Sequence, residues 1–309
     1  MFKGRLLLIF VAFVAVMLMS ANAQAAWSIP TSYLNGADTY LTNSSQGVAY
    51  GPNAPHGTEN VMSRIFMLAG ARVHIGYIRF DLTNVTPAEG HTWADIMQGA
   101  TLSVESVCND GKNRSQRWTG VYGLTLTATG GVADWPEATT TYGGGTYQGN
   151  PMTKAPGMVW TDSTHPAPGY YELNPSNDQM VRLGEILLRK EGAAGNAVIC
   201  TSSPIEQSIQ QTGTAFAVAG SLNLAPYLST MVTETGTNRY VTFAIICEVA
   251  KSNSDWYLTT KEGVGNVTVG GYIGTMAPTL NLPNAIPEPA TIALLGLGGL
   301  SLLRIRRKR

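Results

Sequence analysis

The sequence predicts an all-β protein, a β-sandwich with a partly helical insertion. Two observations favour this fold class: apolar and polar residues alternate with a period of two in several separate stretches, and Gly, Asn and Pro cluster between those stretches. A hydrophobic content of 44% is sufficient for a core, which excludes the disordered class. Residues 26–286 are long enough for one large β domain or two small ones. No Pro/Ser-rich linker divides them, so one β-sandwich body over 26–286 is predicted.

Strands are expected where every second side chain is apolar and can face a core. Ile78 and Phe80 alternate with Arg79 and Asp81, as expected for a strand with one buried face. Strands of this kind are predicted within residues 78–82, 100–105, 122–126, 241–249 and 280–282.

Two helices are expected within an insertion at about residues 175–235. Ser176 or Asn177 is a suitable N-cap for a helix that ends near Lys190, just before Gly192. This helix would place four apolar residues on one side, namely Met180, Leu183, Ile186 and Leu187. A second helix is expected within residues 222–233. The alternative is that this region forms a small separate helical lobe.

The N-terminal residues 1–25 have the pattern of a secretory signal peptide. Lys3 and Arg5 precede an uncharged apolar run over residues 6–19, and Ala23 and Ala25 supply the small-x-small pattern that signal peptidase requires. Cleavage is therefore expected after Ala25. The alternative is an uncleaved membrane anchor.

The C-terminal residues 287–309 combine three features in order. Pro287, Glu288 and Pro289 precede the apolar stretch 290–303, and the basic stretch 304–309 follows it. Fourteen helical residues span about 21 Å, against a hydrocarbon core of about 30 Å, and flanking apolar residues with snorkelling arginines shorten the deficit. A transmembrane helix over 290–303 would leave the basic tail in the cytoplasm and the body outside. The alternative is a buried C-terminal helix.

This three-part tail resembles a PEP-CTERM sorting signal. The resemblance implies recognition by an exosortase, a membrane cysteine transpeptidase or protease, with cleavage near the Pro-Glu-Pro motif. It also implies a bacterium with an outer membrane that makes exopolysaccharide. The chain would then be the substrate of the sorting enzyme, exported by the secretion machinery.

The order of motifs in the body resembles a DNRLRE-type carbohydrate-binding module, which implies a sandwich of jelly-roll kind. The resemblance covers residues 37–282 and departs from the family in the long insertion and at Ala277. The segments that carry it are 37–41, 50–53, 77–82, 100–102, 121–123, 134–142, 260–262 and 277–280.

Charge excludes one class of partner. Seven of the 20 Lys and Arg residues lie in the two terminal segments, which leaves 13 basic and 19 acidic residues in the body, a net charge of −6. A body of that sign is not expected to bind nucleic acid.

The sequence contains no catalytic constellation and no cofactor site. His56, His74, His91 and His165 are scattered, without HExxH or HxH spacing. Asp134 and Glu137 have the spacing of an acid pair, but a turn cap next to a packed Trp135 is the simpler interpretation. Asn109 and Asp110 can contribute to calcium binding, yet no complete set of oxygen ligands follows them. No metal and no catalytic residue is therefore predicted.

Three cysteines in an exported chain permit one disulfide and leave one thiol. Cys200 and Cys247 both follow strand-like apolar residues, so this pair is ranked above those with Cys108. Buried free thiols are the alternative.

One basic and aromatic segment is a candidate ligand site. Lys112, Arg114, Arg117 and Trp118 lie in an expected loop between strands. Arginine can bind a uronate carboxylate with two hydrogen bonds, and tryptophan can stack on a sugar face. The alternative is a solvated loop with Trp118 in the core.

These observations predict an exported, exosortase-sorted, non-enzymatic protein of the envelope or exopolysaccharide matrix, with a polysaccharide-binding or structural role. Two alternatives remain: a polysaccharide lyase or hydrolase, and a protein-binding adhesion or assembly factor.

Overall fold

The computed structural model describes thirteen segments of the chain. These are residues 26–42, 54–62, 67–68, 72–108, 117–126, 134–141, 144–156, 180–188, 198–201, 224–233, 236–246, 256–268 and 271–287. The predicted signal peptide and the predicted helix over 290–303 lie outside them.

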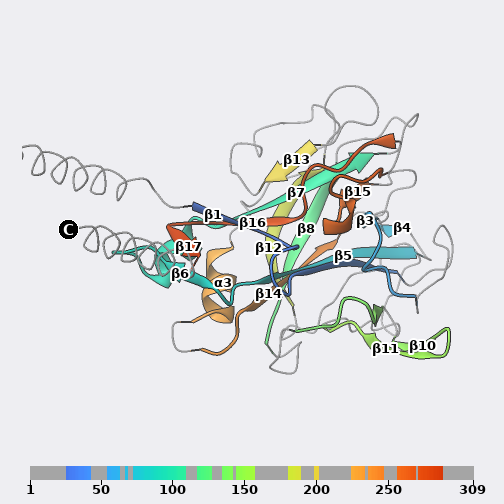
Figure 1. Ribbon diagram of the computed structural model, residues 1–309, viewed down its shortest axis with the longest axis horizontal. Coiled ribbons are helices and arrows are strands. Elements are labelled where there is room, and N and C mark those ends of the chain that lie inside the picture. The colour runs from blue at the N-terminus through green and yellow to red at the C-terminus, as the bar shows by residue number, and fades with distance from the viewer. Residues whose placement is uncertain are drawn as a thin grey trace, which may run out of the picture.

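Two large sheets form the protein, as the all-β prediction requires (Figure 1). The first sheet has the order β1-β16-β7-β15-β3, and β13 also pairs with β7. Its strands are β1 (Ala26–Pro30), β3 (Val61–Met62), β7 (Thr101–Cys108), β13 (Val198–Thr201), β15 (Trp256–Thr259) and β16 (Thr279–Pro283). The second sheet has the order β12-β8-β14-β5-β2, with β4 on β5. Its strands are β2 (Ala37–Thr42), β4 (Met67–Leu68), β5 (Arg72–Asp81), β8 (Arg117–Leu124), β12 (Met180–Leu188) and β14 (Tyr240–Ile246).

The main core lies between the two sheets, which therefore form a sandwich. Leu102 and Leu280 of the first sheet belong to the same buried cluster as Ile78, Phe80 and Phe243 of the second. Because side chains alternate along a strand, the period-2 pattern read from the sequence selects this inner face. The strands expected from that pattern are confirmed as parts of β5, β7, β8, β14 and β16.

A second, smaller core covers the outer face of the second sheet. Ile75 and Tyr77 of β5 lie on this face and pack in one buried cluster with Trp135 and Ala155. The segment that covers them includes β9 (Thr140–Thr141), β10 (Gly145–Tyr147) and β11 (Asn150–Lys154). Trp135 is 2% exposed, which confirms the expected packed tryptophan.

The helix expected to end near Lys190 is wrong. Residues 180–188 form β12, which pairs antiparallel with β8 and is an edge strand of the second sheet. The second expected helix is confirmed as α3 (Ala225–Met231). The segment expected as an insertion thus contributes β12 to one sheet and β13 to the other.

Short elements close one end of the sandwich. Strand β17 (Ala285–Pro287) pairs antiparallel with β6 (Val85–Pro87), and α2 (Trp93–Gln98) contacts β6, β16 and α3. Helix α2 has a capping box, in which Thr92 and Asp95 bind each other's backbone N–H groups. A 3-10 helix, η2 (Lys261–Gly263), follows β15.

Candidate functional site

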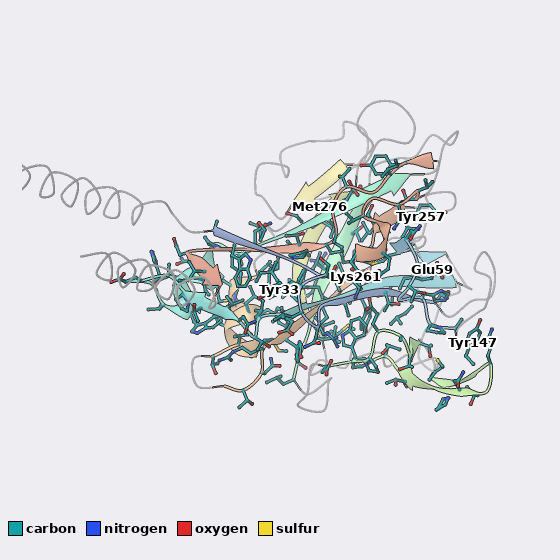
Figure 2. All side chains as sticks on the ribbon, viewed as in Figure 1. Tyr33, Glu59, Tyr147, Tyr257, Lys261 and Met276 are labelled. Atoms are coloured by element: carbon teal, nitrogen blue, oxygen red, sulfur yellow. The ribbon has the colours of Figure 1, made fainter. Side chains whose placement is uncertain are left out.

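Charged side chains from three distant segments meet beside strand β2. We call Thr31, Asp38, Glu137, Lys261 and Glu262 the Asp38 cluster. Asp38 lies in β2, Glu137 follows Trp135 in the segment that covers the second sheet, and Lys261 and Glu262 begin η2. Figure 2 places Lys261 near the centre of the view, away from the hairpin that carries Tyr147.

Asp38 is fully buried and bound by donors of the chain itself. The Thr31 hydroxyl donates to Oδ2, and the Lys261 backbone N–H donates to Oδ2 at 3.1 Å. Burial raises the pKa of Asp38 from 3.8 to about 7, and the nearby carboxylates of Glu262 and Glu137 act in the same direction. Asp38 is therefore partly protonated at neutral pH.

The Lys261 ammonium lies among the carboxylates of the cluster. It donates to Glu137 Oε2 and to the Gly36 carbonyl oxygen at 3.1 Å, and it is 3.8 Å from Glu262 Oε1. The other oxygen of Glu137 accepts the backbone N–H of Asp38 at 2.8 Å. Glu137 thus joins its own segment to both β2 and η2.

The same cluster offers the described residues that best resemble a metal site. Carboxylate oxygens of Asp38, Glu137 and Glu262 lie within 4.8 Å of one another. However, the Lys261 ammonium already supplies a cation there, bonded to Glu137. The geometry fits an internal salt bridge, and no step of any reaction is assigned to a metal ion here.

A raised carboxyl pKa next to a second carboxylate also has the chemistry of a glycosidase acid pair. That chemistry requires contact with a substrate, and Asp38 is 0% exposed. The contacts of the cluster hold three segments together at the edge of the second sheet.

Arg79 forms a second polar network on the outer face of β5. Its Nη2 donates to the Asn35 carbonyl oxygen at 2.6 Å, and its Nη1 donates to Asp134 Oδ1 at 2.6 Å and to the Trp135 carbonyl oxygen. The guanidinium carbon also lies 5.0 Å from the centre of the Trp135 ring and 5.2 Å from that of Tyr240. Asp134 and Glu137 are thus bound by Arg79 and Lys261, respectively.

Sequence reasoning did not find these two networks. It interpreted Asp134 and Glu137 as a turn cap, whereas they bind cations from β5 and η2. The available signal was the presence of charged residues, Asp38 and Arg79, within strand-like stretches of a chain with only 13% charged residues.

The predicted ligand-binding residues are only partly described. Lys112 and Arg114 lie outside the described residues. Arg117 and Trp118 are the first residues of β8, paired with Leu188 and Leu187 of β12, and so do not lie in the expected loop. Their role in binding remains a prediction.

The structure also describes only some of the cysteines, calcium candidates and processing-site residues. Cys200 lies in β13 opposite Val104 of β7, and Cys247 lies outside the described residues, so the pairing stays a prediction. Asn109, Asp110, Ala23, Ala25, Glu288 and Pro289 also lie outside, whereas Pro287 ends β17.

Two histidines are buried parts of the fold. His74 lies in β5, as expected. His56 is 2% exposed, its ring stacks on Tyr40 with 4.0 Å between centroids, and its Nδ1 lies 2.6 Å from Glu59 Oε1. These contacts are typical of packed histidines.

Comparison with known families finds a match at the end of the chain. Residues 285–308 match the PEP-CTERM protein-sorting motif. The match implies recognition by an exosortase, export, and a membrane-anchored sorting signal at the C-terminus. It begins at Ala285, so the first three residues of the motif are those of β17.

No curated protein matches the chain. The resemblance of the body to a DNRLRE-type carbohydrate-binding module finds no support in these comparisons. Among the residues that the structure describes, no helix has the length and apolar character needed to cross a bilayer.

Proposed function

We propose that the protein is an exported, exosortase-sorted component of the cell envelope or exopolysaccharide matrix. Its body would be non-enzymatic and would bind polysaccharide or serve as a structural part of the matrix. The observation that carries the proposal is the position of the sorting motif, which begins in β17, directly after the last strand of the first sandwich sheet, β16. A folded body followed at once by a sorting signal has the organisation of a delivered cargo.

The N-terminal end supports export. Cleavage after Ala25 would leave Ala26 as the first residue of the mature protein, and Ala26 is also the first residue of β1. The predicted processing site therefore lies directly before the first described strand, so removal of the signal peptide would leave that strand complete.

The state of the charged residues supports a non-enzymatic role. Asp38 and Arg79 are buried, and the chain's own groups bind them. Asp134 and Glu137, the acid pair that a hydrolase or lyase would use, form salt bridges with Arg79 and Lys261.

Binding of an acidic polysaccharide is the finer part of the proposal. It depends on Lys112, Arg114, Arg117 and Trp118 and on the jelly-roll resemblance. Arg117 is the first residue of β8, and Lys112 and Arg114 precede it by five and three positions in the sequence. Arginine guanidinium and lysine ammonium groups both suit the carboxylates of a uronate polymer.

A glycan array probed with the mature protein tests this proposal. Replacement of Lys112, Arg114 and Arg117 by Ala should lower affinity for uronate polymers by about tenfold or more, because each charge-assisted hydrogen bond contributes roughly 1.5–3 kcal/mol. The exposed Lys154→Ala in β11 is the matched control and should bind like the wild type.

The outcomes separate the alternatives. Unchanged affinity in a folded triple variant would remove these residues as the site. Absence of glycan binding by the wild type would leave only the structural role. Turnover of any polymer would contradict the proposal that the body is non-enzymatic.

A further inference from the structure

We propose that one end of the sandwich, formed by β1, β6, β17 and α2, lies against the lipid surface while the protein is anchored. We call it the β17 end. The inference rests on the proposed function, since it takes the C-terminal tail as a membrane anchor. The β17 end would contact the lipid headgroups of the bilayer in which the tail is anchored.

The start of the sorting motif is fixed to the body. Ala285 is 1% exposed and belongs to the main core, and Ile286 and Pro287 pair with Thr86 and Val85 of β6. The Ala88 N–H donates to the Asn284 carbonyl oxygen at 2.7 Å, just before the motif. The motif therefore begins as a folded strand and not as a free linker.

The covalent chain then leaves little room between body and membrane. Only Glu288 and Pro289 separate Pro287 from Ala290, where the apolar stretch begins. Three Cα–Cα steps of 3.8 Å extend over at most ~11 Å. An apolar stretch that starts in the bilayer must hold β17 and its neighbours close to the headgroups.

The N-terminal strand begins at the same end. Ala26 of β1 pairs with Pro283 of β16, and β1 also contacts β17. Figure 1 shows the start of β1 together with β6 and β17 on the left, and the β10–β11 hairpin on the opposite side. Both termini of the described body therefore point to one surface.

The side chains at this end suit a membrane interface. Trp27 and Trp93 are partly exposed and packed at the border of the main core. The guanidinium of Arg239 lies 5.5 Å from the centre of the Trp93 ring. Tryptophan and arginine are residues that concentrate at headgroup level. Because Glu89 and Asp95 are exposed in the same region, the tether rather than net charge would impose the contact.

Hydrogen–deuterium exchange of the full-length chain in lipid nanodiscs tests this inference. The discs would contain phosphatidylethanolamine with a minor fraction of phosphatidylglycerol. The matched variant carries a Gly-Ser insertion of about ten residues between Pro289 and Ala290, which adds roughly 17 Å of root-mean-square reach. Exposed amides within residues 83–96 should exchange about tenfold more slowly in the wild type than in the variant.

Amides of the hairpin 144–154 should exchange equally in both proteins, and added salt should not change the difference. Equal exchange of residues 83–96 in two disc-bound proteins would overturn the inference and leave the anchor intact. Failure of the wild type to associate with the discs would overturn the inference together with the proposed anchoring.

Discussion

Asp38 and Arg79 show how single charged residues are used inside this sandwich. Each lies in a strand and is almost completely buried, which would be costly without partners. Asp38 accepts hydrogen bonds from Thr31 and Lys261, and Arg79 donates to Asn35 and Asp134. Each residue therefore replaces its hydrogen bonds to water with hydrogen bonds to loops of the chain. These bonds fix the positions of the loops.

The charge state of Asp38 predicts a pH dependence of stability. Burial raises the pKa of its carboxyl from 3.8 to about 7, so between these values the folded protein keeps a proton that the unfolded chain releases. The contribution of the bound proton to the free energy of unfolding is complete below pH 3.8 and is lost as the pH rises to about 7. The free energy of unfolding should fall by up to about 1.4 kcal/mol per pH unit from this residue alone.

Asp38→Asn supplies the test, because an amide does not titrate. Urea unfolding at several pH values should show that the free energy of unfolding of the variant does not fall in this way. The difference in free energy of unfolding between wild type and variant should therefore change with pH. The exposed Glu89→Gln is the control and should follow the wild type. Parallel curves for wild type and Asp38→Asn across that pH range would contradict the prediction.

At the scale of elements, regular strands were predictable and an irregular one was not. Ile78 and Phe80 alternate strictly with Arg79 and Asp81, and β5 follows. Strand β12 has a bulge between Arg182 and Gly184, which inserts Leu183 into the register. Leu183 and Ile186 consequently both reach the main core at a spacing of three, which imitates one face of a helix.

The Asp38 cluster could not be assembled from the sequence for a different reason. Its members come from positions 31–38, 137 and 261–262, and no local pattern relates them. Only the packing of the two sheets brings β2 of the second sheet next to η2, which follows β15 of the first. The sorting motif is contiguous, by contrast, so its three parts could be recognised in order, and the family comparison confirms the motif over residues 285–308.

Helix α3 is fixed to the second sheet by one tyrosine and one glycine. The Tyr227 hydroxyl lies 2.9 Å from the carbonyl oxygens of Leu124 and Thr242, at the ends of the β8–β14 pairing. A Cβ atom at Gly123 would lie 2.5 Å from the Tyr227 ring. The absence of a side chain at Gly123 therefore allows the ring to reach the strands.

Gly123→Ala should destabilise the protein by roughly 1–3 kcal/mol, because the buried and hydrogen-bonded ring has no free space to enter. Thermal unfolding of Gly123→Ala, Tyr227→Leu and the double variant forms a cycle. The loss from Gly123→Ala should be much smaller in the Tyr227→Leu background. Additive losses would show that the ring is not what Gly123 accommodates.

At the scale of the whole molecule, the body and the sorting signal share residues. Ala285 belongs both to the main core and to the matched motif, so the fold extends into the signal. A cut beyond Pro287 would leave β17 paired with β6 and the sandwich complete. The fold is therefore compatible with removal of the membrane-directed part of the tail after delivery.

Replacement of Pro287, Glu288 and Pro289 by Ala should keep the full-length protein in the membrane. The apolar stretch 290–303 and the basic residues that follow it would still provide an anchor, while the motif that the sorting enzyme reads would be lost. Deletion of residues 288–309 is the complementary variant: it retains β17 and should release a soluble body that is never sorted.

Fractionation followed by mass spectrometry of the C-terminus distinguishes these forms. Wild-type protein recovered from the surface or matrix should end near the motif, because the sorting enzyme has cut it there. If that protein instead still carries Arg309, the tail is a permanent anchor, and the motif does not direct processing.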